Sequence, residues 1–265
     1  MRVKNVVLLL CIAGLSFLYG CNKPTTLEEK EYENVTELFD AITIEMLDAC
    51  NESPSLEAYN NDTLVLLNWY NDDVRLYGIS VGEENAMLLY VQGEKVLIDH
   101  PYRNMHISYP KMNVCDADSD GVEEVAISRE TLTGSPGHWY ELLVCDYEDA
   151  WVVHDYDSYV EDIEAFIDYE YDKDTNTVTF LKKEDGTVLA EVPLPEWTEE
   201  YPYQDAINFA DYIRFDAETM KMEVAPGILL ENSQPYMSIQ ISFDIQYRDG
   251  EFEIMDYEVQ NLDQT

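Results

Sequence analysis

A stretch of nine residues from Asp116 to Glu124 places carboxylates at alternating positions. Its order is Asp-Ala-Asp-Ser-Asp-Gly-Val-Glu-Glu. In a tight loop, acids at the first, third and fifth positions converge on one point, and a glycine at the sixth permits the sharp turn. A backbone carbonyl at the seventh position and an acid at the ninth can add further oxygens. The predicted metal ligands are Asp116, Asp118, Asp120, the backbone of Val122, and Glu124.

Such an all-oxygen loop suits Ca²⁺, which takes about six to eight oxygen ligands, so that water would complete the shell. An EF-hand needs a glutamate at the twelfth position, where this chain has Ile127. The residues after the loop also alternate like a strand rather than a helix. We therefore expect a structural Ca²⁺ site in a β-hairpin. The alternative is an acidic turn that holds no ion.

The strand, the acidic loop and the next strand together resemble the FG-GAP or VCBS type of repeat, an integrin-like calcium loop. The resemblance covers residues 107–155 and implies the ligand positions given above, with Ca²⁺ as the ion. One such loop is visible in the sequence, and the Phe-Gly and Gly-Ala-Pro elements of the repeat are absent. A complete propeller is therefore not expected.

The first residues have the order of a removable export signal. Two basic residues precede an apolar run, Val6–Leu18, which is shorter than the roughly 20 residues needed to cross a bilayer. Leu18-Tyr19-Gly20-Cys21 ends this run and resembles the lipobox of bacterial lipoproteins of the Gram-positive type. The resemblance implies cleavage before Cys21, a diacylglyceryl thioether on Cys21, and anchoring at the extracytoplasmic face of the cell membrane. The alternative is a secreted protein with a chance cysteine at the cut site.

The composition sets limits on partners. The chain has 15 Lys+Arg against 55 Asp+Glu, a formal net charge of −40. Removal of residues 1–20 would take away two basic residues and no acidic one, which leaves −42. Such a surface repels nucleic acid and anionic lipid headgroups, so nucleic acid is excluded as a partner. Hydrophobic residues at 46% are nevertheless sufficient to build a core, so disorder is not expected.

Apolar spacing predicts the elements that position the loop. One amphipathic helix is expected to open at Thr26-Leu27-Glu28-Glu29, with Thr26 as its cap, and to end near residues 49–51. From Thr63 onward, short alternating runs predict strands. The predicted fold class is mainly β (α+β), with antiparallel meander or sandwich-like sheets and one N-terminal amphipathic helix.

Composition shifts divide the chain. Strict alternation over Met237–Tyr247, followed by Asp249-Gly250, is the clearest hairpin signal. The expected regions are a signal peptide (1–20), a lipidated tether (21–26), a helix plus β-meander region (27–192) with the acidic hairpin at 107–155, a Pro-rich connection (193–204), and a C-terminal β-hairpin region that packs on the rest (205–265).

Motifs for catalysis are absent from the sequence. The four histidines have no zinc-binding spacing, and no Cys-x-x-Cys, nucleophile elbow or phosphate-binding loop occurs. Cys50, Cys115 and Cys145 allow at most one internal disulfide, and buried free thiols are the alternative. These observations predict a protein that is not an enzyme.

The scattered aromatics offer a different function. Trp139 follows the polar loop 131–138 and is the predicted exposed contact for a ligand. The sequence thus predicts a non-enzymatic binding or adaptor module whose partner is an unknown protein or glycan. The alternatives are a cell-surface carbohydrate- or wall-binding protein that uses its aromatics, and a hydrolase that uses an acid pair.

Overall fold

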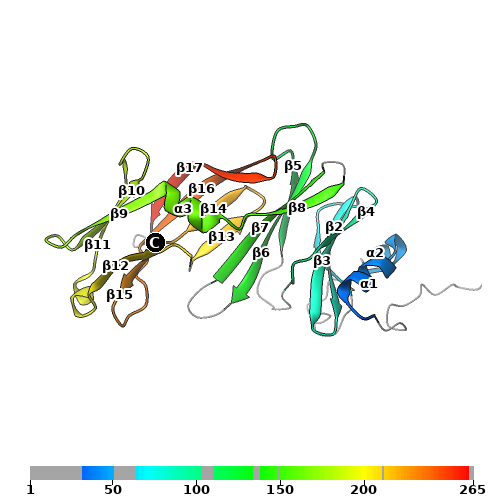
Figure 1. The fold of residues 1–265 in the computed structure, drawn as a ribbon, viewed down its shortest axis with the longest axis horizontal. Coiled ribbons are helices and arrows are strands. Elements are labelled where there is room, and N and C mark those ends of the chain that lie inside the picture. Colours follow the sequence, from blue (N-terminus) through cyan, green and yellow to red (C-terminus); the bar gives the residue numbers. More distant parts are fainter. Residues whose placement is uncertain are drawn as a thin grey trace, which may run out of the picture. The chain divides into compact units, whose positions relative to one another are not determined.

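The computed structural model describes six segments of the chain, all within one compact unit, Tyr32–Thr265. The segments are residues 32–50, 64–102, 110–133, 138–147, 150–210 and 212–262, with the backbone only at 131–133, 138, 139 and 199. Antiparallel sheets dominate these segments and the helices are short (Figure 1). The predicted mainly-β fold class is therefore confirmed.

The first sheet is an antiparallel meander of four strands. It consists of β1 (Leu64–Trp69), β2 (Val74–Val81), β3 (Glu84–Val91) and β4 (Glu94–Ile98), paired in chain order. These strands agree with the prediction of short strands from Thr63 onward. Buried residues run almost without interruption along β2 and β3, because both faces of this sheet are covered.

Two helices, α1 (Val35–Ala41) and α2 (Ile44–Cys50), stand where one long helix was expected. The prediction was wrong because the backbone adopts an extended conformation at Ile42, which ends α1. The second helix begins after Thr43, whose hydroxyl accepts the Met46 amide at 3.4 Å. A hydroxyl in that position satisfies an amide that the new helix leaves free, as an N-cap does. The predicted cap, Thr26, lies outside the described residues.

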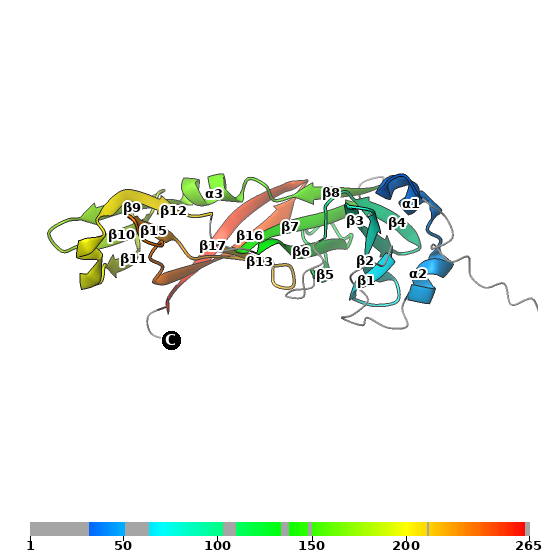
Figure 2. The same ribbon diagram turned by 90° about the horizontal axis from the view of Figure 1, so that it is seen from below.

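Both helices lie against the first sheet, where α1 contacts β2 and β3 and α2 contacts β1 (Figures 1 and 2). Lys95 on β4 donates from its ammonium to the carbonyls of Phe39 and Ile42, each at 2.6 Å. The Tyr77 hydroxyl donates to the Leu47 carbonyl at 3.3 Å. These contacts hold the helices to one face of the sheet and leave its other face for the next layer.

The second sheet is also a four-stranded meander, and it carries the acidic loop. Its strands are β5 (Lys111–Cys115), β6 (Glu124–Thr133), β7 (His138–Tyr147) and β8 (Trp151–Asp155). In its centre, residues 125–127 and 142–145 are all buried. Alternate residues face opposite sides of a strand, so this sheet is covered on both faces.

The two faces of the second sheet belong to different hydrophobic cores. Val125, Ile127 and Leu143 pack with residues of the first sheet. Ala126 and Val144 pack with residues from the C-terminal half of the chain. The second sheet is therefore the layer shared by the two cores, and the acidic loop extends from its edge pair β5–β6.

The C-terminal half holds a helix that the sequence did not predict, α3 (Tyr159–Phe166). The expectation of a single N-terminal helix was wrong here. Only Ile163 in this short helix is buried, so its apolar face is too narrow for the periodicity to stand out among the surrounding tyrosines and acids. The chain then enters a three-stranded sheet of β9 (Ile167–Asp172), β10 (Thr177–Lys182) and β11 (Val188–Pro193).

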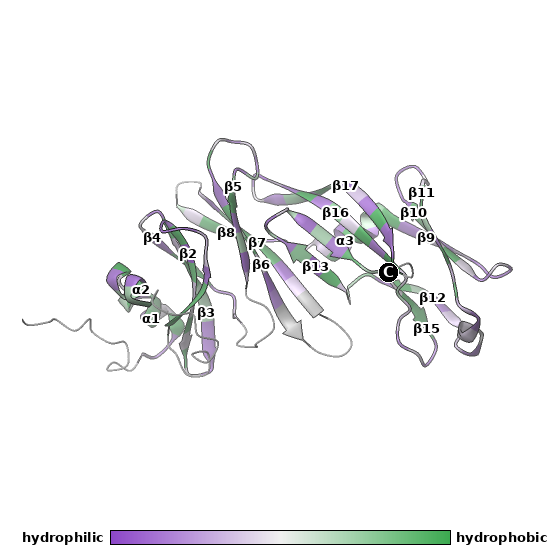
Figure 3. Cartoon of the chain, turned by 180° about the vertical axis from the view of Figure 1, so that it is seen from behind, coloured by the Kyte–Doolittle hydropathy of each residue, from purple (hydrophilic) through white to green (hydrophobic). Residues whose placement is uncertain are grey.

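The remaining strands form a two-stranded and a four-stranded sheet. They are β12 (Tyr203–Asn208) with β15 (Gly227–Leu230), and β13 (Ile213–Asp216), β14 (Lys221–Val224), β16 (Ile239–Arg248) and β17 (Glu251–Asn261). The predicted hairpin is confirmed as β16–β17, with buried residues alternating along β16 and the turn at Asp249-Gly250. Figure 3 shows hydrophobic and hydrophilic residues mixed along this hairpin. The Pro-rich connection carries a short 3₁₀ helix, η3 (Glu196–Glu200).

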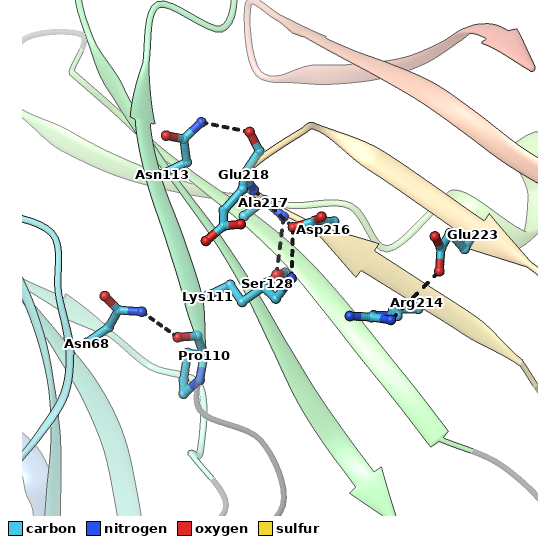
Figure 4. Close-up of polar contacts among 10 residues, drawn as sticks. All are labelled: Asn68, Pro110, Lys111, Asn113, Ser128, Arg214, Asp216, Ala217, Glu218 and Glu223. Carbon is cyan, nitrogen blue, oxygen red and sulfur yellow. Dashed lines mark hydrogen bonds and ion pairs between the residues drawn. The ribbon is translucent and has the colours of Figure 1, made fainter.

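Polar contacts join the second sheet to the β13–β14 hairpin (Figure 4). The Ala217 amide donates to the Ser128 hydroxyl at 3.2 Å, and the Lys111 ammonium lies 3.3 Å from an Asp216 carboxylate oxygen. Ser128 is buried, so its bond satisfies a polar group inside the core. The acidic loop is thus supported by a sheet that is held on both sides.

The three described cysteines, Cys50, Cys115 and Cys145, are free thiols. Cys145 is fully buried, and burial raises the pKa of its thiol to about 12, so it packs as a small apolar residue. In the described segments, no helix has the length and apolarity that crossing a membrane requires.

Candidate metal site

The acidic loop connects β5 to β6, and the sheet closes it. Cys115, the last residue of β5, pairs with Glu124, the first residue of β6. The loop between them therefore begins and ends at adjacent points of the sheet. This closure brings the first and last acids of the sequence pattern together.

The four predicted acids converge. One carboxylate oxygen each from Asp116, Asp118, Asp120 and Glu124 lies within 4.8 Å of the others. Two oxygens bound to the same Ca²⁺ are at most about 5.2 Å apart, because each lies about 2.3–2.6 Å from the ion. The spacing of the four oxygens therefore fits a single central cation.

The carboxylates also fold the loop on themselves. Asp118 Oδ1 accepts the Asp120 amide at 2.9 Å, and Asp120 Oδ1 accepts the Val122 amide at 2.6 Å. Ser119 and Gly121 have positive φ angles of 69° and 93°. Glycine has no Cβ and therefore adopts the positive φ at position 121 readily. Val122 itself lies exposed on the loop, and its carbonyl remains a predicted ligand.

Glu124 differs from the other three acids because its side chain is fully buried. Its Oε2 accepts the Ala117 amide, and its Oε1 has no hydrogen-bond partner among the described residues. Burial, and then the charges of Asp118 and Asp146, raise its pKa to about 7, although the Ala117 amide opposes the shift. A buried carboxylate oxygen without a partner costs free energy. A bound cation would supply the missing partner.

A fifth acid, Asp146, lies behind the loop and was not predicted as part of the site. The pairing of Val125 with Cys145 places Asp146 at the end of β7, across from the start of β6. Asp146 is buried, and its Oδ2 accepts the Tyr247 hydroxyl at 2.9 Å. Burial and the Asp146 contact raise the pKa of Tyr247, so this hydroxyl stays a neutral donor. The sequence signal for Asp146 is a single acid that ends the apolar run 142–145.

A second polar cluster surrounds His100. Its Nε2 lies 2.8 Å from Asp155 Oδ2, and its Nδ1 lies 3.4 Å from Glu141 Oε2, which also accepts from Arg129. The hydrogen bonds to Asp155 and Glu141 raise the pKa of His100 to about 9, so the imidazole is charged at neutral pH. His100, Asp155, Glu141 and Arg129 therefore form an ion-pair network.

Other predicted site residues lie outside what the structure describes. Cys21 and the signal sequence precede the first described residue, Tyr32. Trp139 belongs to β7, where its backbone pairs with Leu132, and the structure does not describe its side chain. Lipidation at Cys21 and ligand contact at Trp139 therefore stay predictions.

No family model matches the chain, and no curated protein or solved structure is significantly similar to it. The chemistry that the site can perform follows from its own residues. It offers converging carboxylate oxygens, one of them on a buried side chain, and no basic residue is among them.

Proposed function

We propose that the chain is a lipid-anchored, extracytoplasmic binding or adaptor protein in which the loop 116–124 holds one structural Ca²⁺. The observation that supports the ion assignment is the convergence of the four acids, one of which, Glu124, is buried and has an oxygen without a partner among the described residues. Like charges this close repel one another, and a divalent cation would turn that repulsion into attraction.

The donor set favours Ca²⁺ over other divalent ions. All four side chains offer oxygen, whereas Zn²⁺ prefers sulfur and nitrogen and Mg²⁺ keeps several of its waters. The Val122 carbonyl and water would complete the shell. All ligands come from one loop between paired strands, so the ion would fix the path of that loop. This supports a structural rather than a catalytic role, as in the calcium loops that the sequence resembles.

Calorimetry tests the ion. We expect heat from Ca²⁺ binding to the purified full chain at millimolar calcium, since extracellular modules bind at about 10⁻⁴–10⁻³ M. The double variant Asp118→Ala/Asp120→Ala should lose this heat. The matched control Asp172→Ala/Asp174→Ala, in the acidic turn 172–176 between β9 and β10, should keep it. Equal heat from wild type and the Asp118/Asp120 variant would refute the ion site.

The anchor has a separate test. Two acyl chains hold a protein stably at a membrane, whereas one is marginal. We therefore expect radioactive palmitate to label the wild type and the protein to fractionate with membranes. Cys21→Ala should lose both properties, and Cys50→Ala should keep both. Labelling and membrane retention that persist in Cys21→Ala would contradict the lipid anchor and leave the ion site unaffected.

A further inference from the structure

A groove of about 630 Å³ opens beside the acidic loop. Three places in the fold line it: Gln92 and Glu94 at the β3–β4 turn, Val122 and Glu123 in the acidic loop, and the last residue of β7 with the first residue of β8. Its volume is in the range of sites that hold small ligands, about 300–1,000 Å³. None of the four converging acids lines the groove, although Val122 and Glu123 of the same loop do.

Two aromatic side chains form one side of this groove. Tyr147 and Trp151 are opposite each other on β7 and β8, and their ring centroids are 5.4 Å apart. Their planes meet at 62°, so the rings do not present one flat platform. Sugars stack on flat aromatic faces, whereas angled aromatic walls are the arrangement that surrounds an organic cation.

The polar side of the groove is negative. Glu94 and Glu123 are exposed acids, and no described residue that lines the groove is basic. Lys95 follows Glu94 in the chain, but its ammonium is bound by the α1 carbonyls of Phe39 and the adjoining Ile42, on the helix-covered face of the sheet. It therefore does not neutralise the groove. The chain as a whole, at −40, also attracts cations.

We propose that this groove binds an organic ammonium group, with Tyr147 and Trp151 facing the cation and Glu94 and Glu123 balancing its charge. The ammonium would be a lysine side chain of a partner protein, because Glu94, Glu123 and Gln92 offer oxygens that accept its N–H bonds. Gln92 adds an amide oxygen that accepts from a primary ammonium. This inference rests on the proposed role as a binding module, and it names the chemistry of the ligand without requiring the Ca²⁺.

Equilibrium dialysis of the purified full chain in detergent, at about 0.15 M salt to screen general attraction, tests the groove. The probes are Nα-acetyl-lysine methylamide, choline, and the neutral choline isostere 3,3-dimethylbutan-1-ol. The lysine probe should bind about tenfold or more tightly than the isostere, since only a charge gains from the ring faces and the acids. Tighter binding of choline than of the lysine probe would overturn the assignment to lysine and point to a quaternary headgroup.

Variants locate the binding in the groove. Tyr147→Leu and Glu94→Gln change exposed residues and should each weaken ammonium binding about fivefold. The matched controls Tyr70→Leu and Glu253→Gln, exposed residues outside the groove, should have no effect. Trp151 is not substituted, because it packs against the hydrophobic core that the first and second sheets share.

Several results would overturn the inference. These are equal binding of the isostere, binding of neither ammonium, equal losses in the control variants, or a neutral oligosaccharide that binds and is lost in Tyr147→Leu. The last result would assign the groove to glycan. Ca²⁺ heat is measured on the same wild-type preparation. A protein that binds Ca²⁺ but no ammonium would therefore refute the ammonium site and leave the Ca²⁺ site unaffected.

Discussion

Two acidic turns of this protein share a spacing but differ in their surroundings. In the loop 116–124, Asp118 Oδ1 accepts the amide two residues ahead at 2.9 Å. In the turn 172–176, Asp172 Oδ1 does the same at 2.9 Å. Hydrogen bonds from the Asp174 amide and the Thr175 side chain lower the pKa of Asp172, which is exposed. Burial and neighbouring acids instead raise the pKa of Asp118.

The difference originates in the strand that follows each turn. Six residues beyond the accepting aspartate, the first turn has Glu124 and the second has Val178, and both are fully buried. Val178 packs in a hydrophobic core, whereas Glu124 places a buried carboxylate close to the carboxylates of the other acids. An acidic turn with locally satisfied carboxylates needs no ion. The same turn beside a buried acid is where we propose the ion.

The largest expected difference between the turns is in pH dependence. The pKa of Glu124 is raised from 4.5 to about 7 in the folded chain. Without metal, the unfolded chain therefore loses the Glu124 proton at lower pH than the folded chain. The free energy of unfolding should fall by about 3 kcal/mol as pH rises from the unfolded pKa through the folded one.

Urea unfolding with a chelator, at about pH 5 and about pH 8, measures this loss. Glu124→Gln should remove most of it. Asp172→Asn should keep it, because the lowered pKa of Asp172 acts in the opposite direction, with stability lost only as pH falls. An unchanged pH dependence in Glu124→Gln would show that the buried glutamate does not distinguish the turns.

A tyrosine hydrogen bond lies near each turn, and loss of the two bonds should lower the free energy of unfolding by different amounts. The Tyr247 hydroxyl donates to the buried Asp146 carboxylate at 2.9 Å, and the Tyr171 hydroxyl donates to the neutral Asn176 amide at 2.8 Å. Tyr247→Phe should lower the free energy of unfolding by about 2 kcal/mol and Tyr171→Phe by about 1 kcal/mol, because bonds to charged groups contribute more. Thermal unfolding of both variants checks the ranking, and equal losses would contradict it.

The sequence predicted well what depends on local spacing. The strands of the first sheet and the β16–β17 hairpin follow alternation and turn chemistry. The convergence of the acids follows from their positions in a loop whose glycine allows a tight turn. In both cases, the information lies within about ten residues of chain.

The sequence could not predict what depends on distant contacts. Asp146 and Tyr247 are 101 residues apart, and no spacing rule connects them. The burial of Glu124 requires the sheet behind it, and Glu124 and Glu123 look alike in sequence. The break between α1 and α2 was also missed. The helical spacing of apolar residues continues from Ile42 to Met46, whereas the backbone at Ile42 is extended.

Calcium should stabilise the protein through the first turn alone. At ten times the dissociation constant, a ligand that binds only the folded state adds about 1.4 kcal/mol to the free energy of unfolding. Wild type and Asp174→Ala should both gain this amount in a thermal melt with Ca²⁺. Asp118→Ala should gain nothing. Equal stabilisation of all three proteins would place the ion elsewhere, and stabilisation by Mg²⁺ to the same extent would argue against a Ca²⁺ site.

The smallest expected effect separates backbone strain from ion binding. Gly121 and Gly186, from different turns, have φ angles of 93° and 70°, and no atom lies within 4 Å of a Cβ added to either. Gly121→Ala and Gly186→Ala should therefore each lower the free energy of unfolding by about 1 kcal/mol without metal, since only the positive φ opposes the methyl group.

With Ca²⁺ the two alanine variants should diverge. Strain at Gly121 moves Asp120 and Val122, which carry proposed ligands, so Gly121→Ala should also bind Ca²⁺ more weakly in calorimetry. Gly186→Ala should bind it like wild type. Equal Ca²⁺ affinity in both variants would show that the turn at Gly121 does not set the ligand geometry, and the ion would then depend on the buried Glu124 rather than on the path of the loop.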